Sequence, residues 1–472
     1  MHRGGHRSAP QDTCRNRGGG TGGAPQTSLP RNLRGRRPPR QCFLHWRLIR
    51  HGGGRSPFFT RDRRLHCEAV AGTHGENAVI DFEQLLPQIA DLVRYRLEEQ
   101  SASASGREAA LEVLARATDV WESLAERIEA ADAGGLVAIP HEAPTTKHPL
   151  PAIPNAYGVL ATDGSQIGYD RNEVAPCALI NVGRVRIEYG DVPLVQLEAR
   201  PTLLYRAEEL MEADGGDSHA LSARRVATLR MERECQELKR LIEETRGPVP
   251  AVAMVDGTLI PWSLEAEPDD IRAQALKHFE AMLEAGRTAQ VPVVGYISDP
   301  GSRDVMNLLH AYRCGIESAP CGLRCFSRRE LRRGAACEPL QDLVDAVLFE
   351  GLLEPGERSA VFSSRSRILS SLAPVNRTRF CYVRLPNEVA RLEMPAWVAE
   401  DEERMERLHA VVWDQAQKGL GYPRALTEAH ELAVVRGDDR RLFFELLSAQ
   451  LAAKGLPLIR TGKAVSKIVR SV

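Results

Sequence analysis

The stretches YGVLATDGSQI, residues 157–167, and AVAMVDGTLI, residues 251–260, decide the fold of this chain. Each begins as an apolar run typical of a buried strand and then reaches an Asp, a Gly and a hydroxyl residue. Because glycine lets the backbone turn sharply, each stretch predicts a strand that ends at an exposed carboxylate. Residues just past strand ends line the ligand crevice of open α/β sheets. We therefore expect Asp163 and Asp256 to face one space; the alternative is two ordinary turns.

Apolar patterns on both sides of these stretches predict a mixed α/β chain without internal repeats. Strands that turn near Gly183 and Gly190 are expected first, followed by a long helix. The remaining strands are expected at 251–257, 291–298, 345–353, 359–364 and 379–385. The helices are expected at 218–245, 269–285, 302–312, 402–417, 423–435 and 440–453.

The N-terminal part of the chain differs in composition from the rest. Residues 1–67 contain 15 Arg, no Lys and two Asp, and residues 1–75 are rich in Gly and Pro, which predicts disorder. Such a segment is either a basic nucleic-acid tail or upstream sequence included by a misplaced start. Helices near 79–100, capped by Asp81, and near 108–131 are expected next, before a Pro-rich linker. We divide the chain into 1–75, a helical extension at 76–150 and a catalytic domain at 151–472.

Charge and cysteine content limit the classes of function. The formal net charge is -1, so the chain beyond residue 67 carries -1 minus 13, or -14. Such an acidic body disfavours non-specific DNA coating unless divalent metals offset its carboxylates. No apolar run is long enough to cross a membrane, and the Arg-rich N-terminal segment lacks the apolar core expected of a secretory signal. The ten cysteines form no CxxC pair, which favours reduced thiols in a cytoplasm over structural zinc at Cys314, Cys321, Cys325 and Cys337.

The predicted helix at 218–245 adds a third acid. Its buried stripe is expected to contain Ala227, Met231, Leu238 and Leu241. Glu234 falls on that stripe, where a carboxylate is costly unless it is paired or binds a metal. The alternative for Glu234 is an ion pair with Arg230. Glu232 and Glu237 lie nearer the flanks, and we expect both to be solvated.

Three carboxylates from a strand, a helix and a later strand are typical of a site for Mg²⁺ or Mn²⁺. Two such ions about 4 Å apart could activate water and stabilise the leaving oxygen in phosphodiester hydrolysis. The helix within GYPRALTEAHELAVVR, residues 421–436, adds His430 at the border of its apolar face. By itself, such a His is more often a satisfied core residue than a ligand, and only the acidic site already inferred makes His430 a candidate.

Four segments together resemble the NurA nuclease family, whose members are partners of hexameric HerA-type DNA-translocating ATPases in end resection. The segments are TDGS at 162–165, VDGTL at 255–259, GYIS at 295–298 and GYPRALTEAHELAVV at 421–435. The resemblance spans roughly residues 157–467 and implies an RNase H-like mixed sheet core with flanking helices.

The resemblance also implies roles for individual residues. It makes Asp163 and Asp256 metal ligands and His430 a ligand or catalytic helper. Glu234 is the expected helical acid, with Glu232 as the fallback. Asp299 departs from the family pattern, and either a further ligand or a cap for the next helix would explain it. Arg303 is expected to contact a phosphate or to be a solvated helix residue.

The implied activity is a Mn²⁺-dependent, or Mg²⁺-dependent, nuclease that acts as an endonuclease on single-stranded DNA and as a 5′ to 3′ exonuclease. The family further implies a homodimer that works with a HerA-type ATPase in double-strand break repair. The chain itself has no Walker-type segment, so ATP-driven motion would come from that partner. The alternatives are a non-catalytic RNase H-like adaptor between an ATPase and DNA, and a nuclease directed to RNA or hybrids.

Overall fold

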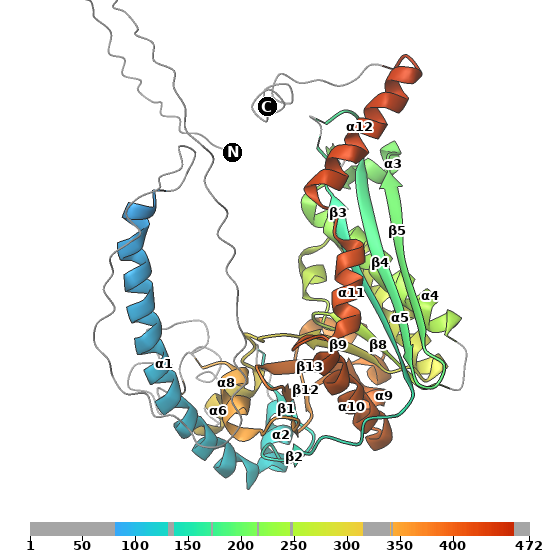
Figure 1. The fold of residues 1–472 in the computed structure, drawn as a ribbon. Helices are drawn as coiled ribbons and strands as arrows, with labels where there is room; N and C mark the ends of the chain where they lie inside the picture. Colours follow the sequence, from blue (N-terminus) through green and yellow to red (C-terminus); the bar gives the residue numbers. More distant parts are fainter. Residues whose placement is uncertain are drawn as a thin grey trace, which may run out of the picture. The chain divides into compact units, whose positions relative to one another are not determined.

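The computed structural model describes residues 81–130, 136–170, 173–214, 217–245, 249–314, 340 and 343–456, all within the compact unit Asp81–Val472. A mixed sheet runs through this unit in the order β1-β11-β12-β13-β9-β8-β3-β4-β5, with β10 and β2 attached beside β12 (Figure 1). Its strands are β1 (Ile139–Pro140), β2 (Lys147–His148), β3 (Tyr157–Ile167), β4 (Ala178–Tyr189), β5 (Leu194–Leu204), β8 (Ala251–Asp256), β9 (Val293–Ile297), β10 (Arg358–Ser359), β11 (Phe362–Ser363), β12 (Thr378–Arg384) and β13 (Val389–Pro395).

The unit also contains helices, most of which pack against the sheet. They are α1 (Phe82–Thr118), α2 (Trp121–Ala130), α3 (Ala207–Leu210), α4 (Ala223–Glu244), α5 (Asp269–Ala289), α6 (Asp304–Cys314), α8 (Asp345–Leu352), α9 (Ala396–Ala399), α10 (Glu402–Lys418), α11 (Arg424–Ala433) and α12 (Gly437–Ala453). A separate hairpin is formed by β6 (Met211–Asp214) and β7 (Asp217–Ala220). None of the described helices is long and apolar enough to span a bilayer.

The strand order confirms the predicted mixed α/β class. Strands β3, β4 and β5 form an antiparallel meander, and β8 and β9 then add parallel to β3 on its other side. Helix α4 precedes β8, and α5 connects β8 to β9. Three meandering strands followed by two parallel strands with intervening helices are the RNase H-like arrangement that the sequence predicts.

Alternation of side chains along β3 divides the interior into two layers. Tyr157, Val159 and Ala161 pack into the same core as α10 and α11. Leu160 points to the opposite face, where it packs with α4 and α5. The two helices that carry predicted site residues, α4 and α11, therefore lie on opposite faces of the sheet.

The helical extension packs on the other end of the sheet. The second half of α1, with α2, α6 and α8, shares a core with Phe380 and Tyr382 of β12. As predicted, Asp81 caps the first helix, since its Oδ1 accepts a hydrogen bond from the amide of Gln84 at 3.2 Å. The expected second helix is instead the end of α1 followed by α2. The Pro-rich linker contributes the short strands β1 and β2.

Several other predictions were wrong. The turn expected at Gly183 lies inside β4, whereas Gly190, with a φ of 138°, does turn the chain. Residues 345–353 form the helix α8 instead of a strand, and β13 was not predicted. The long helix begins at Ala223, after β7, with Ser222 as its N-cap. The expected tail at 1–75 and Cys321, Cys325 and Cys337 lie outside the described residues.

Candidate active site

Two of the predicted acids are neighbours by strand register. The parallel pairing of β3 with β8 ends at Thr162 and Val255, so Asp163 and Asp256 are the next residues along the two strands. As predicted, β8 ends at Asp256, and Gly257 then turns the chain away with a φ of 104°. Asp163 was wrongly placed at a strand end, because β3 continues to Ile167 through its pairing with β4.

The third acid reaches this place because Gly164 has no side chain. A Cβ on Gly164 would overlap Oε1 of Glu234 and lie 2.8 Å from Cγ of Arg230. Helix α4 is held over the strand by the Thr162 hydroxyl, which donates to the Glu234 carbonyl oxygen at 3.3 Å. The glycine thus provides space for the Glu234 carboxylate beside Asp163, a role different from the turn expected at this position.

Glu234 is both paired and exposed to a cavity. Its Oε1 lies 3.2 Å from Nε of Arg230, which is the ion pair that the alternative interpretation predicted, and its side chain keeps 23% of its exposure. Burial raises the pKa of Glu234 to about 7, and the negative charges of Asp163 and Asp256 add to that rise, while Arg230 opposes it. The three carboxylates therefore interact electrostatically although they come from three different elements.

His430 approaches Asp163 from the opposite face of the sheet and does not line the cavity that contains the three acids. Its Nδ1 lies 2.9 Å from Oδ2 of Asp163, and its side chain is 58% exposed, so it is not a core residue. The end of α11 is fixed across β3 and β4 by polar side chains. Asn181 donates to the carbonyl oxygens of Leu432 and Ala433 at 3.0 and 2.9 Å.

A close approach of backbones also places α11. A Cβ on Gly183 would overlap the carbonyl oxygen of Ala429 and lie 2.9 Å from Cβ of Leu432. Ser165 donates from its hydroxyl to the Ala433 carbonyl oxygen and accepts from the Val435 amide at 3.1 Å. The hydroxyl after the Asp-Gly pair therefore anchors the helix that carries His430, a role the sequence did not reveal.

Tyr422 is a further contact of Asp256 that the sequence analysis missed. Burial raises the pKa of Tyr422, and its hydrogen bond to Asp256 adds to the rise. The Tyr422 ring packs edge-on against Tyr296 at a centroid distance of 5.3 Å, and the Tyr296 hydroxyl donates to Glu388 at 2.6 Å. Its only signal in the sequence is its position two residues before the start of α11.

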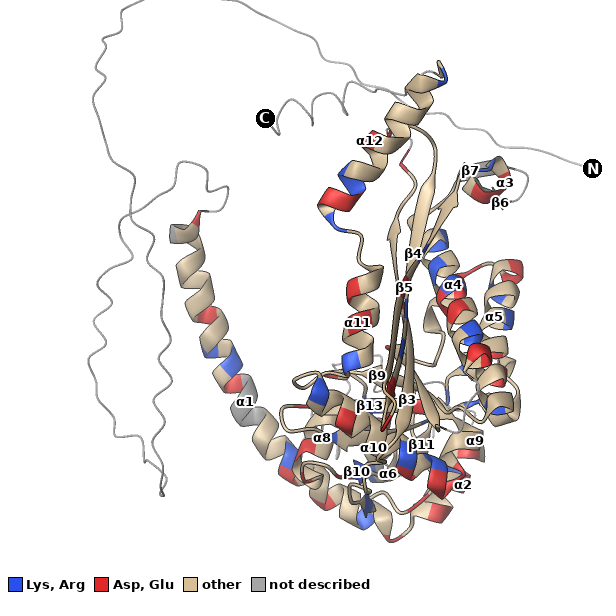
Figure 2. Cartoon of the chain, turned by 45° about the vertical axis from the view of Figure 1, so that its right-hand side comes forward, with Lys and Arg blue, Asp and Glu red and all other residues tan. Residues whose placement is uncertain are grey.

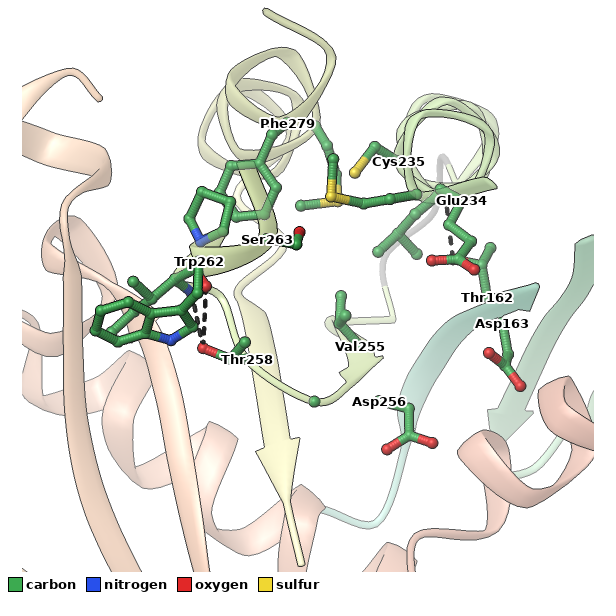
Figure 3. A pocket seen from close by; sticks show the side chains of 16 residues that line it. Thr162, Asp163, Glu234, Cys235, Val255, Asp256, Thr258, Trp262, Ser263 and Phe279 are labelled. Carbon is green, nitrogen blue, oxygen red and sulfur yellow. Dashed lines mark hydrogen bonds between the residues drawn. The ribbon is translucent and has the colours of Figure 1, made fainter. Parts of the chain in front are cut away.

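The three carboxylates line one cavity of about 440 Å³ (Figure 3). Within the described part of the chain, no three His, Cys, Asp or Glu side chains converge closely enough to form a metal-binding group as they stand. The donor set nevertheless fits a hard divalent cation, because Asp163, Glu234 and Asp256 offer carboxylate oxygens to one space. Burial raises the pKa of Glu234, and the charges of the other two acids add to that rise.

Other predicted residues lie elsewhere. Glu232 and Glu237 were expected to be solvated, but they are buried, at 3% and 8% exposure, because arginines reach them. Glu232 pairs with Arg225 at 3.0 Å, and Glu237 pairs with Arg184 at 3.4 Å. Glu232 is therefore occupied by a structural ion pair and does not line the cavity of the three acids.

Asp299 does not line that cavity and does not cap a helix. Its amide donates to Glu388 at 3.2 Å, and its φ is 44°. The cap of α6 is instead Asp345, which accepts from the amides of Val305 and Met306 at 3.1 and 2.8 Å. Arg303 precedes α6, is partly buried and lines a second cavity.

Comparison with known proteins adds a family match. A family model for the NurA domain matches residues 157–435. No curated protein matches the chain. Two solved structures of Aquifex aeolicus Argonaute are similar at 8% and 10% identity, with TM-scores of 0.25 and 0.24. These alignments cover 59% and 60% of this chain but only 28% and 29% of the Argonaute chains.

A third solved structure, LC9-RNase H1, is described as a type 1 RNase H with the type 2 active-site motif. It is similar at 15% identity and a TM-score of 0.17, over 32% of this chain and 68% of that one.

Proposed function

Because the chain belongs to the NurA family, we propose that it is a metal-dependent DNA nuclease. The observation that carries this proposal is the meeting of Asp163, Glu234 and Asp256 at one cavity, from two strands and one helix. Their register and the space left by Gly164 bring three negative charges together in a position that costs stability. A site that requires these charges for chemistry explains such an arrangement.

Asp163, Glu234 and Asp256 would hold the cation, with His430 as a fourth ligand or catalytic helper. A bound Mn²⁺ or Mg²⁺ would supply charge neutralisation at the phosphate and a more acidic water. Arg230, which reaches the site, is already paired with Glu234. Figure 2 shows acidic and basic residues interleaved along α4 and α5.

The chain's own side chains would orient the reaction. Asp163 engages Nδ1 of His430, which leaves Nε2 of this exposed ring to exchange a proton with substrate or solvent. Asn181 and Ser165 hold the helix that presents the ring. Tyr422 restrains Asp256 and limits the directions in which its carboxylate can point.

The wider role follows from the family. We propose that the chain acts as a single-stranded endonuclease and a 5′ to 3′ exonuclease, as a homodimer with a HerA-type hexameric ATPase, in resection of double-strand breaks. Because an acidic nuclease would bind DNA weakly by itself, a partner ATPase that moves the DNA through the complex would complement it. The free thiols of Cys177, Cys235 and Cys381 support a reducing compartment such as the cytoplasm.

The test is cleavage by the purified full-length chain. A 5′-labelled single-stranded oligonucleotide, a 3′-labelled duplex and an RNA of the same sequence are incubated with Mn²⁺, Mg²⁺ or EDTA. We expect metal-dependent DNA cleavage that Asp163→Asn and Asp256→Asn abolish while circular dichroism shows both variants folded. Absence of cleavage under every metal, also with a HerA-type ATPase added, would favour the non-catalytic adaptor. Preferential cleavage of the RNA would favour a nuclease directed to RNA instead of DNA.

A further inference from the structure

The cavity that holds the acids has a second, apolar part. Beyond the carboxylates, the wall of the cavity is formed by α4, by α5 and by the loop that follows β8. The apolar lining residues are Met231, Leu238, Val255, Ile260, Pro261, Trp262, Phe279 and Met282. Figure 3 shows Phe279 and Cys235 across the hollow from Asp256. The volume of about 440 Å³ lies in the range of roughly 300 to 1,000 Å³ that pockets for small organic ligands occupy.

One short loop connects the charged and the apolar parts. Asp256 ends β8, and Trp262 begins the next helical turn, η1 (Trp262–Ala266). The loop is fixed by Glu393 of β13, which is 1% exposed. Its Oε2 accepts from the Thr258 hydroxyl and from the Leu259 amide, both at 2.7 Å. The distance between carboxylate and indole is therefore set by an anchored segment.

Trp262 is placed to offer a flat surface. Its side chain is only partly buried, and together with Thr258 it lines both this cavity and a neighbouring one of about 380 Å³. Ser263, exposed at the same place, adds a hydroxyl. An aromatic face with thioether and aliphatic neighbours and few polar groups suits a flat heteroaromatic ring.

We propose that this apolar part binds the nucleobase of an unpaired nucleotide next to the scissile phosphodiester, with Trp262 as its stacking platform. The inference rests on the proposed nuclease function, because the acids set the position of the phosphate. A ligand with an anionic end for a cation at the acids and a flat ring for the apolar wall is a nucleotide. Its base must be unpaired to enter a cavity, so the pocket selects single-stranded or frayed DNA.

The test measures binding instead of cleavage. Fluorescein-labelled single-stranded oligonucleotides carry one abasic nucleotide at successive positions, and affinity for the full-length chain is measured by anisotropy in Ca²⁺ before any product forms. Stacking of one base corresponds to roughly 5- to 150-fold in affinity. We expect an abasic penalty of about tenfold at one position for the wild type, and no penalty for Trp262→Ala, which binds the intact strand about tenfold more weakly.

Two further variants make the outcome interpretable. Trp262→Phe keeps an aromatic face and should keep most of the penalty, while Val192→Ala, at a side chain that is 86% exposed, should leave it unchanged. The proposal is overturned if the wild type shows no binding or no penalised position, or if Trp262→Ala retains the wild-type penalty. If the chain cleaves DNA but shows no abasic penalty, the base-pocket proposal is wrong and the nuclease proposal stands. If it shows the penalty but never cleaves, the nuclease proposal is wrong and the base-binding pocket stands.

Discussion

Asp163 and Asp256 occupy the first positions beyond the last paired register of two adjacent parallel strands, Thr162 with Val255. Their relative placement is set by a hydrogen-bonded ladder, so neither carboxylate depends on a flexible loop for its position. The pairing of β3 with β8 ends there while β3 continues. His430 contacts Asp163 from one face of the sheet, and Glu234 interacts with both acids from the other.

Removal of the divalent metal should lower the thermal stability of the wild type. A ligand that binds only the folded chain adds about 2.7 kcal/mol at a concentration 100 times its Kd. We expect Mn²⁺ to raise the Tm by several degrees over EDTA, as followed by scanning calorimetry. Asp163→Asn and Asp256→Asn should abolish this rise, and an equal rise in all three proteins would place the metal elsewhere.

Gly164→Ala should displace Glu234 without unfolding the chain. The new Cβ overlaps the carboxylate at the end of the flexible Glu234 side chain and lies 2.8 Å from Cγ of Arg230, so both side chains of α4 must shift. We expect Mn²⁺ affinity, measured by calorimetric titration, and nuclease activity to fall at least about tenfold. Gly168→Ala is the matched control on the same stretch, because a Cβ there meets nothing within 4 Å. Similar behaviour of the two variants would contradict the space-making role.

Glu234 should make stability depend on pH in the absence of metal. Its pKa of about 7 in the folded chain exceeds the ordinary value of 4.5, so the folded state binds the proton more tightly. The contribution of Glu234 to the free energy of unfolding is therefore fully present below pH 4.5. It falls as the pH rises and levels off above pH 7, with a total loss of order 3 kcal/mol.

Urea unfolding in EDTA at several pH values measures this loss. Glu234→Gln should flatten the curve between pH 4.5 and 7 and be more stable than the wild type at pH 8. A variant with the wild-type slope would assign the pH dependence to other groups.

Gly183→Ala should destabilise the chain by loosening α11 from the sheet. Its Cβ would overlap the carbonyl oxygen of Ala429, which is backbone and cannot turn away. Forcing extra volume into packed contacts costs typically about 1 to 3 kcal/mol. Urea unfolding measures this loss, and Gly437→Ala, in open space at the start of α12, provides the control. We also expect lower nuclease activity, since His430 moves with the helix.

Tyr422→Phe should weaken the metal site while the fold persists. The variant keeps the ring packed against Tyr296 and removes only the hydroxyl that bonds Asp256. A hydrogen bond to a charged group contributes about 1.5 to 3 kcal/mol, and the exposure of Asp256 favours the lower end, about tenfold in Mn²⁺ affinity. Tyr95→Phe, at an exposed tyrosine of α1, should bind Mn²⁺ as the wild type does.

The sequence predicted the elements whose local pattern and tertiary role agree. Strands β3, β4, β8, β9 and β12 and helices α4, α5, α6, α10 and α11 have apolar spacing that matches the face they bury. Strand β13 escaped prediction because Arg391 and Glu393 point inward and pair with each other at 2.8 Å, which breaks the apolar alternation. Residues 345–353 were predicted as a strand because Ala346, Val347, Leu348 and Phe349 form a continuous apolar run without a helical period.

The candidate site was predictable in its residue types but not in its geometry. Asp256 follows from a strand that ends in Gly, and Glu234 from a carboxylate on an apolar stripe. The continuation of β3 past Asp163 depends on its pairing with β4, and no local sequence pattern predicts that pairing. Burial of Glu232 and Glu237 depends on arginines from other turns and strands, so spacing along α4 could not reveal it.

Gly164 and Gly183 matter for anyone who compares this chain with its relatives. Both glycines are easily taken for loop residues, yet each lies within a strand. Because neither has a side chain, α4 can contact β3 at Gly164 and α11 can contact β4 at Gly183. A relative that retains all the acids and the histidine but has a larger residue at either position would have the reactive groups without the means to assemble them. Inspection of the two positions that lack side chains is therefore a quick criterion for separating active members of the family from inactive ones.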